Sequence, residues 1–162
     1  MLMALLLAVT TLSAHAQFEQ GTKYLNTTLT GLDMSYQKNH FNFGLDAKAG
    51  YFVADELMVY GQFGYNFQNI KGNGNDVNKL NLGVGGRYYI LQNGLYLNLG
   101  AKFEHVYSGS SFNNIALTPE VGYCFYLNHY LSVEPAVYYD MSLNHFSENS
   151  KVGLKVGFGY YF

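Results

Sequence analysis

The sequence predicts an all-β fold, an eight-stranded antiparallel up-and-down transmembrane β-barrel preceded by a cleavable signal peptide. Three observations predict it. Apolar and polar residues alternate over eight segments, as in strands with one apolar face. Charged residues are only 12% of the chain while aromatic residues reach 17%, which is unusual for a soluble domain. The mean hydropathy of -0.05 is neutral, so the apolar residues are diluted by polar ones at short range.

The N-terminal residues 1–16 are predicted to be a secretory signal peptide, which leaves residues 17–162 as one β-barrel domain. An apolar run, Met1–Val9, is followed by Ala14-His15-Ala16, an A-x-A cleavage pattern. The run is too short to be a transmembrane helix. No Lys or Arg precedes it, so we expect the natural start to lie a few residues upstream.

The clearest strand pattern lies at the C-terminal end of the chain, over residues 151–162. One face of this segment is wholly apolar and consists of Val152, Leu154, Val156, Phe158, Tyr160 and Phe162. The same alternation predicts seven further strands at 22–32, 41–51, 57–67, 80–90, 95–107, 115–127 and 131–143. Pro119 and Pro135 fall inside two of these strands, where each is expected to remove a ladder hydrogen bond; a β-bulge is one way to accommodate this, and the role of the two prolines stays open.

The predicted connections alternate in length. Short ones lie at 53–56, 92–94 and 128–130, and Asn93-Gly94 is a strong hairpin signal. Longer polar ones lie at 35–40, 68–78, 108–114 and 144–150. Short turns at one end and longer loops at the other are typical of a barrel of the bacterial outer membrane.

Charged residues indicate which face points inward. Eleven of them, five acids and six bases, lie on or beside strands two to eight, and every one falls opposite the apolar stripe. Nine are expected to form a network in the lumen: Asp46, Lys48, Arg87, Lys102, Glu104, Glu120, Glu134, Asp140 and Lys155. The other two are Lys79 and Lys151. Opposite charges can pair in a narrow, water-poor interior.

Aromatic residues support the same orientation. Six of them lie near strand ends on the apolar stripe, where aromatic girdles meet the lipid headgroups: Tyr88, Tyr107, Tyr123, Tyr139, Tyr160 and Phe162. Glycines crowd the opposite face, as the interior of an eight-stranded barrel requires. A soluble carrier barrel would place the apolar stripe inside, which this distribution disfavours.

Two segments carry a resemblance to a known family. The alternation ending in Phe158, Tyr160 and Phe162, and the strand-turn-strand segment Gly50–Leu57, are similar to features of small outer-membrane β-barrel proteins. These are the OmpX-like and OmpA transmembrane-domain-like barrels, often labelled porin family. The resemblance covers the whole predicted barrel domain. It implies a location in the outer membrane of a Gram-negative cell, and an assembly signal in the three C-terminal aromatic residues that the barrel-assembly machinery reads.

Several partners and cofactors are not expected. The net charge is -2 and no Lys/Arg cluster occurs, so nucleic acid is not expected to bind. Cys124 is the only cysteine. The histidines, including His40, His105, His129 and His145, lack metal-ligand spacing. No metal or other cofactor is therefore predicted.

The segment His145–Glu148 is the one place with the residue types of an enzyme. Its His-x-Ser pair is similar to that of lipid A deacylase barrels. In that family an acid lies about a dozen residues further on, where this chain has Gly157 and Phe158. Without an acid to orient the imidazole, a His-Ser pair is not activated, so we expect no enzymatic activity.

The sequence therefore predicts a monomeric barrel with a structural or surface-interaction role, a lumen filled by side chains and no large pore. Its expected partners are outer-membrane lipid, lipopolysaccharide and the barrel-assembly machinery. The sequence leaves two alternatives open, a narrow diffusion channel and an outer-leaflet lipid-modifying enzyme.

Overall fold

The fold is known from a computed structural model, which describes residues 18–30, 40–70, 77–90, 93–107, 112–143 and 151–162. Within these ranges the chain forms nine strands. They are β1 (Lys23–Thr30), β2 (His40–Ala54), β3 (Leu57–Ile70), β4 (Val77–Tyr89), β5 (Leu95–Tyr107), β6 (Phe112–Tyr123), β7 (Phe125–Tyr126), β8 (Leu131–Ser142) and β9 (Lys151–Tyr161). In this part of the chain no helix is long and apolar enough to cross a membrane.

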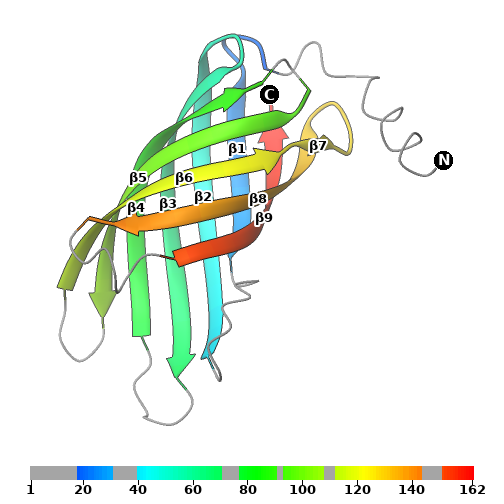
Figure 1. Ribbon diagram of the computed structural model, residues 1–162. Helices are drawn as coiled ribbons and strands as arrows, with labels where there is room; N and C mark the ends of the chain where they lie inside the picture. The colour runs from blue at the N-terminus through cyan, green and yellow to red at the C-terminus, as the bar shows by residue number, and fades with distance from the viewer. Residues whose placement is uncertain (1–17, 31–39, 71–76, 91–92, 108–111, 144–150) are drawn as a thin grey trace.

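The nine strands close into an eight-stranded barrel (Figure 1). Every pairing is antiparallel, and β1 pairs with both β2 and β9. Both β6 and β7 pair with β8, and they form one strand that is interrupted only at Cys124. The predicted eight-stranded antiparallel barrel is confirmed.

The strand ends differ from the prediction both at the β2–β3 turn and on the loop side. Strand β2 runs to Ala54, β3 continues to Ile70 and β4 begins at Val77. The extended β3 and β4 pair with each other from Leu57↔Tyr88 to Gln68↔Val77. Cross-strand pairing therefore continues where the polar composition at 68–78 predicted a loop.

Local turn chemistry explains the tight connections at the other end. Gly94 has a positive φ of 88°, and the Asn93 side chain accepts a hydrogen bond from the Leu95 amide at 2.9 Å. At the next turn Asn128 accepts hydrogen bonds from the amides of Tyr130 and Leu131, each at 2.8 Å. Asn and Gly favour these conformations, and both turns lie where the sequence predicts them.

The two prolines leave gaps in one seam of the barrel, between β6/β7 and β8. The ladder there omits the pairs that Pro119 and Pro135 would make, with Tyr139 and Tyr123. On both sides of each gap the register is unchanged, so each proline interrupts the ladder, as the sequence predicted, without a β-bulge. Proline has no N–H to donate to the ladder, and its effect here is a missing pair rather than an inserted residue.

The barrel is apolar outside and polar inside. On the outer face Leu82 and Val84 are 64% and 66% exposed, whereas Arg87 on the inner face of the same strand is 1% exposed. Exposing many large apolar side chains while burying charges would be unfavourable in water. The same distribution is stable when the exterior contacts lipid. The structure is therefore that of a transmembrane β-barrel.

Candidate functional site

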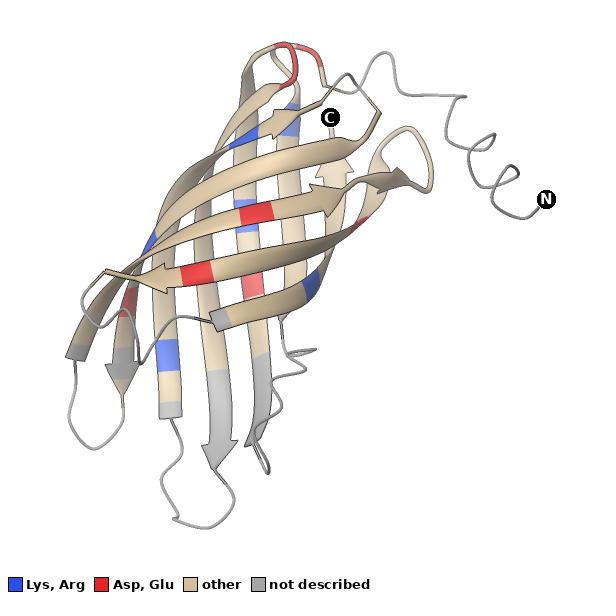
Figure 2. Ribbon diagram, viewed as in Figure 1, with Lys and Arg blue, Asp and Glu red and all other residues tan. Residues whose placement is uncertain are grey.

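Figure 2 shows that Lys, Arg, Asp and Glu positions are spread along the strands over much of the length of the barrel. The structure places all nine residues of the predicted lumen network on the inner face. Lys48, Arg87, Glu120, Glu134, Asp140 and Lys155 are buried, and Asp46, Lys102 and Glu104 are partly buried. Buried charges are stable only when they are paired and hydrogen-bonded, so their contacts decide what the lumen can do.

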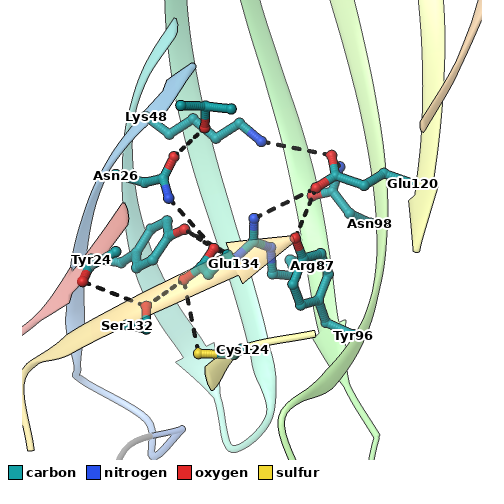
Figure 3. A network of polar contacts seen from close by, with 12 residues as sticks. Tyr24, Asn26, Lys48, Arg87, Tyr96, Asn98, Glu120, Cys124, Ser132 and Glu134 are labelled. Carbon is teal, nitrogen blue, oxygen red and sulfur yellow. Dashed lines mark hydrogen bonds and ion pairs between the residues drawn. The ribbon is translucent and has the colours of Figure 1, made fainter. Parts of the chain in front are cut away.

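Glu134 of β8 and Arg87 of β4 form the centre of the network (Figure 3). Arg87 Nη1 lies 2.7 Å from Glu134 Oε2. The hydroxyls of Tyr24, Tyr161 and Ser132 donate to the same carboxylate at 2.6, 2.8 and 2.8 Å. These contacts surround the carboxylate with donors from β1, β4, β8 and β9.

Aromatic side chains enclose the Arg87 guanidinium. Its Nη1 donates to the hydroxyls of Tyr24 and Tyr89 at 3.0 and 3.1 Å. Its carbon lies 3.9 Å from the ring centroid of Tyr96, within cation–π range. The cation is thereby held at one position in the lumen.

Glu120 of β6 gathers a second set of partners. Lys155 Nζ lies 2.5 Å and Lys48 Nζ 3.7 Å from its Oε2. The Asn98 amide and the Tyr96 hydroxyl donate to the carboxylate at 3.1 and 3.0 Å. Because Arg87 Nη2 also lies 3.9 Å from Glu120, the two carboxylates and their three cations form one connected network, here called the central network.

A smaller group lies nearer the loop end. Lys102 Nζ lies 2.7 Å from Asp140 and 3.1 Å from Glu104. Thr118 donates to Asp140 at 2.8 Å, across one of the two ladder gaps described above. Asn114 donates to Glu104 at 3.1 Å. Asp46, on β2, accepts a hydrogen bond from Asn81 at 3.1 Å.

Glycines on the inner face make room for these side chains. A Cβ at Gly159 would lie 2.4 Å from Glu134 Oε1 and 2.5 Å from Ser132 Oγ. A Cβ at Gly122 would lie 2.3 Å from the Tyr96 hydroxyl oxygen. Both distances are below van der Waals contact, so the network depends on the absence of a side chain at these positions.

The sequence prediction named the charged members of the network but missed its uncharged ones. Tyr24, Tyr96, Tyr161, Ser132 and Asn98 each hydrogen-bond a buried carboxylate. The alternation of side chains along each strand could have identified these residues, because each lies on the inner face of its strand.

The residues of the predicted assembly signal lie on the outer face. Phe158, Tyr160 and Phe162 are all about half exposed. Phe162 also extends the closure of the barrel, since its amide donates to the Lys23 carbonyl at 3.0 Å and its carbonyl accepts from the Lys23 amide at 2.8 Å.

The segment His145–Glu148, the one candidate for enzymatic chemistry, lies outside the described residues. Among the residues that the structure does describe, no group of three or more His, Cys, Asp or Glu side chains could hold a metal ion.

The closed barrel, its apolar exterior and its short turns at one end define a small transmembrane barrel of the outer-membrane type. No protein-family model matches the chain. No curated protein matches it in sequence. Several solved structures, in contrast, match along nearly their whole length.

Three of these structures are outer-membrane or surface proteins of Gram-negative bacteria. Neisserial surface protein A is 17% identical with a TM-score of 0.61, over 87% of this chain and 96% of that one. The outer membrane protein OprG of Pseudomonas aeruginosa is 18% identical with a TM-score of 0.59, over 90% and 98%. Ail, the attachment invasion locus protein of Yersinia pestis, solved with the heparin analogue sucrose octasulfate, is 18% identical with a TM-score of 0.57, over 88% and 99%. The resemblance to small outer-membrane barrels is thus confirmed at the level of the fold, in agreement with the predicted outer-membrane location.

Proposed function

We propose that this chain is a small outer-membrane barrel with a structural or surface-interaction role, whose lumen is closed by its own side chains so that it forms no stable pore. The proposal includes the absence of enzymatic activity. It also includes lipopolysaccharide and the barrel-assembly machinery as partners.

The observation that carries the proposal is a pair of contacts across the full width of the barrel. Lys48 on β2 and Glu120 on β6 are four strands apart in a closed ring of eight, and they lie 3.7 Å apart. The hydroxyls of Tyr89 on β4 and Tyr161 on β9 are also four strands apart, and they lie 2.9 Å apart. Side chains from opposite walls that touch leave no continuous water path between them, as expected for a barrel of this size.

Energetics favour keeping these contacts in place. Glu120 and Glu134 are nearly fully buried, and separating a buried carboxylate from its cations costs several kcal/mol. Spontaneous opening of the central network should therefore be rare. A closed lumen argues against a role as a diffusion channel.

Single-channel recording tests the closed lumen. The folded protein in a planar lipid bilayer should show little or no sustained conductance. A matched variant, Lys48→Ala, removes the Lys48–Glu120 contact across the barrel while Glu120 keeps its contact with Lys155, and it should show more frequent brief openings than the unmodified protein. Reproducible long-lived openings of the unmodified protein would contradict the proposal and favour a channel.

The topology supports a surface role for the other end of the barrel. The connections after β1, β3, β5 and β8 all join strands at the end opposite the tight turns, and those after β1 and β8, of nine and eight residues, are the longest. In barrels of this type the longer loops are extracellular. The structurally similar Ail has been solved with a sulfated heparin analogue, which supports, by analogy of fold, a role for such loops in binding.

Binding measurements test this part of the proposal. The folded barrel should bind either lipopolysaccharide vesicles or heparin, and shortening the connections at residues 31–39 and 144–150 should weaken that binding. Variants of the tight turn at 128–130 serve as the control and should bind normally. Failure to bind either probe would contradict the surface-interaction role and leave the structural one.

A further inference from the structure

Phe18 lies in the mouth of the barrel at the turn end, and the sequence pattern assigned it no role. Its side chain is 1% exposed. Its ring stacks on Tyr89 with 3.8 Å between centroids and lies 6.1 Å from Phe52. It also lies 5.7 Å from the ring of Tyr126 and 6.1 Å, edge to face, from that of Tyr161.

The four contacted rings show where Phe18 sits in the cross-section. Phe52, Tyr89, Tyr126 and Tyr161 belong to β2, β4, β7 and β9. With β6 and β7 counted as one strand, these are every second strand of the closed ring. A side chain that touches evenly spaced strands all round the barrel must lie near the barrel axis. We call these four rings the aromatic collar.

The backbone around Phe18 is fixed to the β2–β3 turn. The Phe18 carbonyl accepts a hydrogen bond from the Glu56 amide at 2.7 Å. Gly21 N–H donates to the Phe52 carbonyl, and Phe52 N–H donates to the Thr22 carbonyl, each at 2.9 Å. At the rim the Gln20 amide donates to Asp55 at 2.9 Å. The segment is thus anchored by its ring inside the barrel and by its backbone at the rim.

The central network lies directly behind the collar. The Tyr161 hydroxyl donates to Glu134 at 2.8 Å, and the sulfur of Cys124 lies 3.4 Å from the same hydroxyl. Cys124 is 3% exposed and belongs to the same buried cluster as Phe18. Water that passed the collar would reach these groups first.

We propose that Phe18–Thr22 is a plug that closes the turn end of the lumen, and that the aromatic collar is a binding site for a phenyl ring, occupied by the chain's own Phe18. The plug is distinct from the central network, because it closes the lumen with an apolar ring at the mouth rather than with ion pairs. Removal of the predicted signal peptide after Ala16 would leave Phe18 as the second residue of the mature chain, so the plug would persist after export.

The rate of chemical modification of Cys124, the only cysteine in the sequence, measures whether the plug is in place. Phe18→Ala in the folded full-length barrel should raise the rate at which a small, charged methanethiosulfonate reagent modifies Cys124, by about tenfold or more, because the local barrier to access is removed. The matched control is Phe125→Ala. Phe125 adjoins Cys124 in sequence, but its ring is 43% exposed on the outer face, so its loss should leave the rate unchanged. Gel migration before and after boiling verifies that each variant is folded.

Two further measurements complete the test. Phe18→Leu keeps an apolar side chain and should give an intermediate rate, so it replaces Phe18→Ala if that variant does not fold. Benzyl alcohol should slow the modification of Cys124 in Phe18→Ala, because it supplies the missing ring, whereas an aliphatic alcohol at the same concentration should not. Equal rates for unmodified protein and the Phe18 variants would overturn the plug. Equal effects of the two alcohols would overturn the phenyl-binding site.

Discussion

Arg87 and Glu134 form a buried ion pair between strands β4 and β8, with 2.7 Å between Nη1 and Oε2 and side-chain exposures of 1% and 0%. The two residues are 47 positions apart in sequence. The intact pair contributes little net stability, because its attraction is offset by the cost of removing both charges from water. Loss of one partner, in contrast, is strongly destabilising, because the remaining charge is then buried without compensation. The lumen is therefore sensitive to single substitutions.

Double-mutant analysis of this pair should show that the two residues act together. Arg87→Met and Glu134→Gln should each lower the free energy of unfolding by about 3–5 kcal/mol, and the double variant should lose less than the sum of the two. Denaturant unfolding followed by far-ultraviolet circular dichroism measures this, since the chain contains no Trp. Strictly additive losses would show that the pair does not couple.

Glycine substitutions should distinguish the two faces of the barrel wall. Gly122→Ala places a Cβ 2.3 Å from the Tyr96 hydroxyl oxygen, whereas a Cβ at Gly61 meets no atom within 4 Å. Overpacking typically costs about 1–3 kcal/mol, so Gly122→Ala should reduce the folded fraction seen on a gel run without boiling. Gly61→Ala is the matched control and should fold normally. Equal folding of the two variants would mean that Tyr96 is not held where the structure places it.

Replacing Pro119 should repair the ladder between β6 and β8. Leu143 N–H donates to the Ile115 carbonyl, so residues at even spacing from Ile115 on β6, Pro119 among them, direct their backbone groups towards β8. Pro119→Val supplies the missing donor, and the new amide should exchange hydrogen slowly, like its strand neighbours. Pro135→Val should do the same at the second gap. Exchange as fast as in an unpaired loop would show that the gaps have another cause.

The C-terminal aromatic residue should be needed for assembly. Phe162→Ala keeps the backbone hydrogen bonds to Lys23 but removes a ring that is 53% exposed on the outer face, so it should lower the amount of folded protein in the outer-membrane fraction. Phe125→Ala, an outward aromatic residue at the same end of the barrel, is the control. If both variants reach the membrane equally well, the C-terminal ring carries no special assembly information.

Much of the barrel could be predicted from the sequence because the pattern that identifies a strand lies within the strand's own residues. Side chains alternate between faces with a period of two, so Leu82 and Arg87 could be assigned to opposite faces without knowledge of any contact. The turns at Asn93-Gly94 and Asn128 were predictable for the same reason, since each depends on residues only a few positions apart.

Tertiary structure alone decided which of the lumen residues meet. Lys48 contacts Glu120, and Phe18 contacts Tyr89 and Tyr161, only because closure of the sheet brings distant strands to opposite sides of a narrow space. The alternation of side chains along a strand shows which face a residue occupies. It does not show the height of the residue along the barrel or its neighbour across the lumen, because both depend on the stagger of all eight strands. The effect of Pro119 and Pro135 was undecided for a related reason, because a missing ladder bond and a bulge differ only in the register of the partner strand.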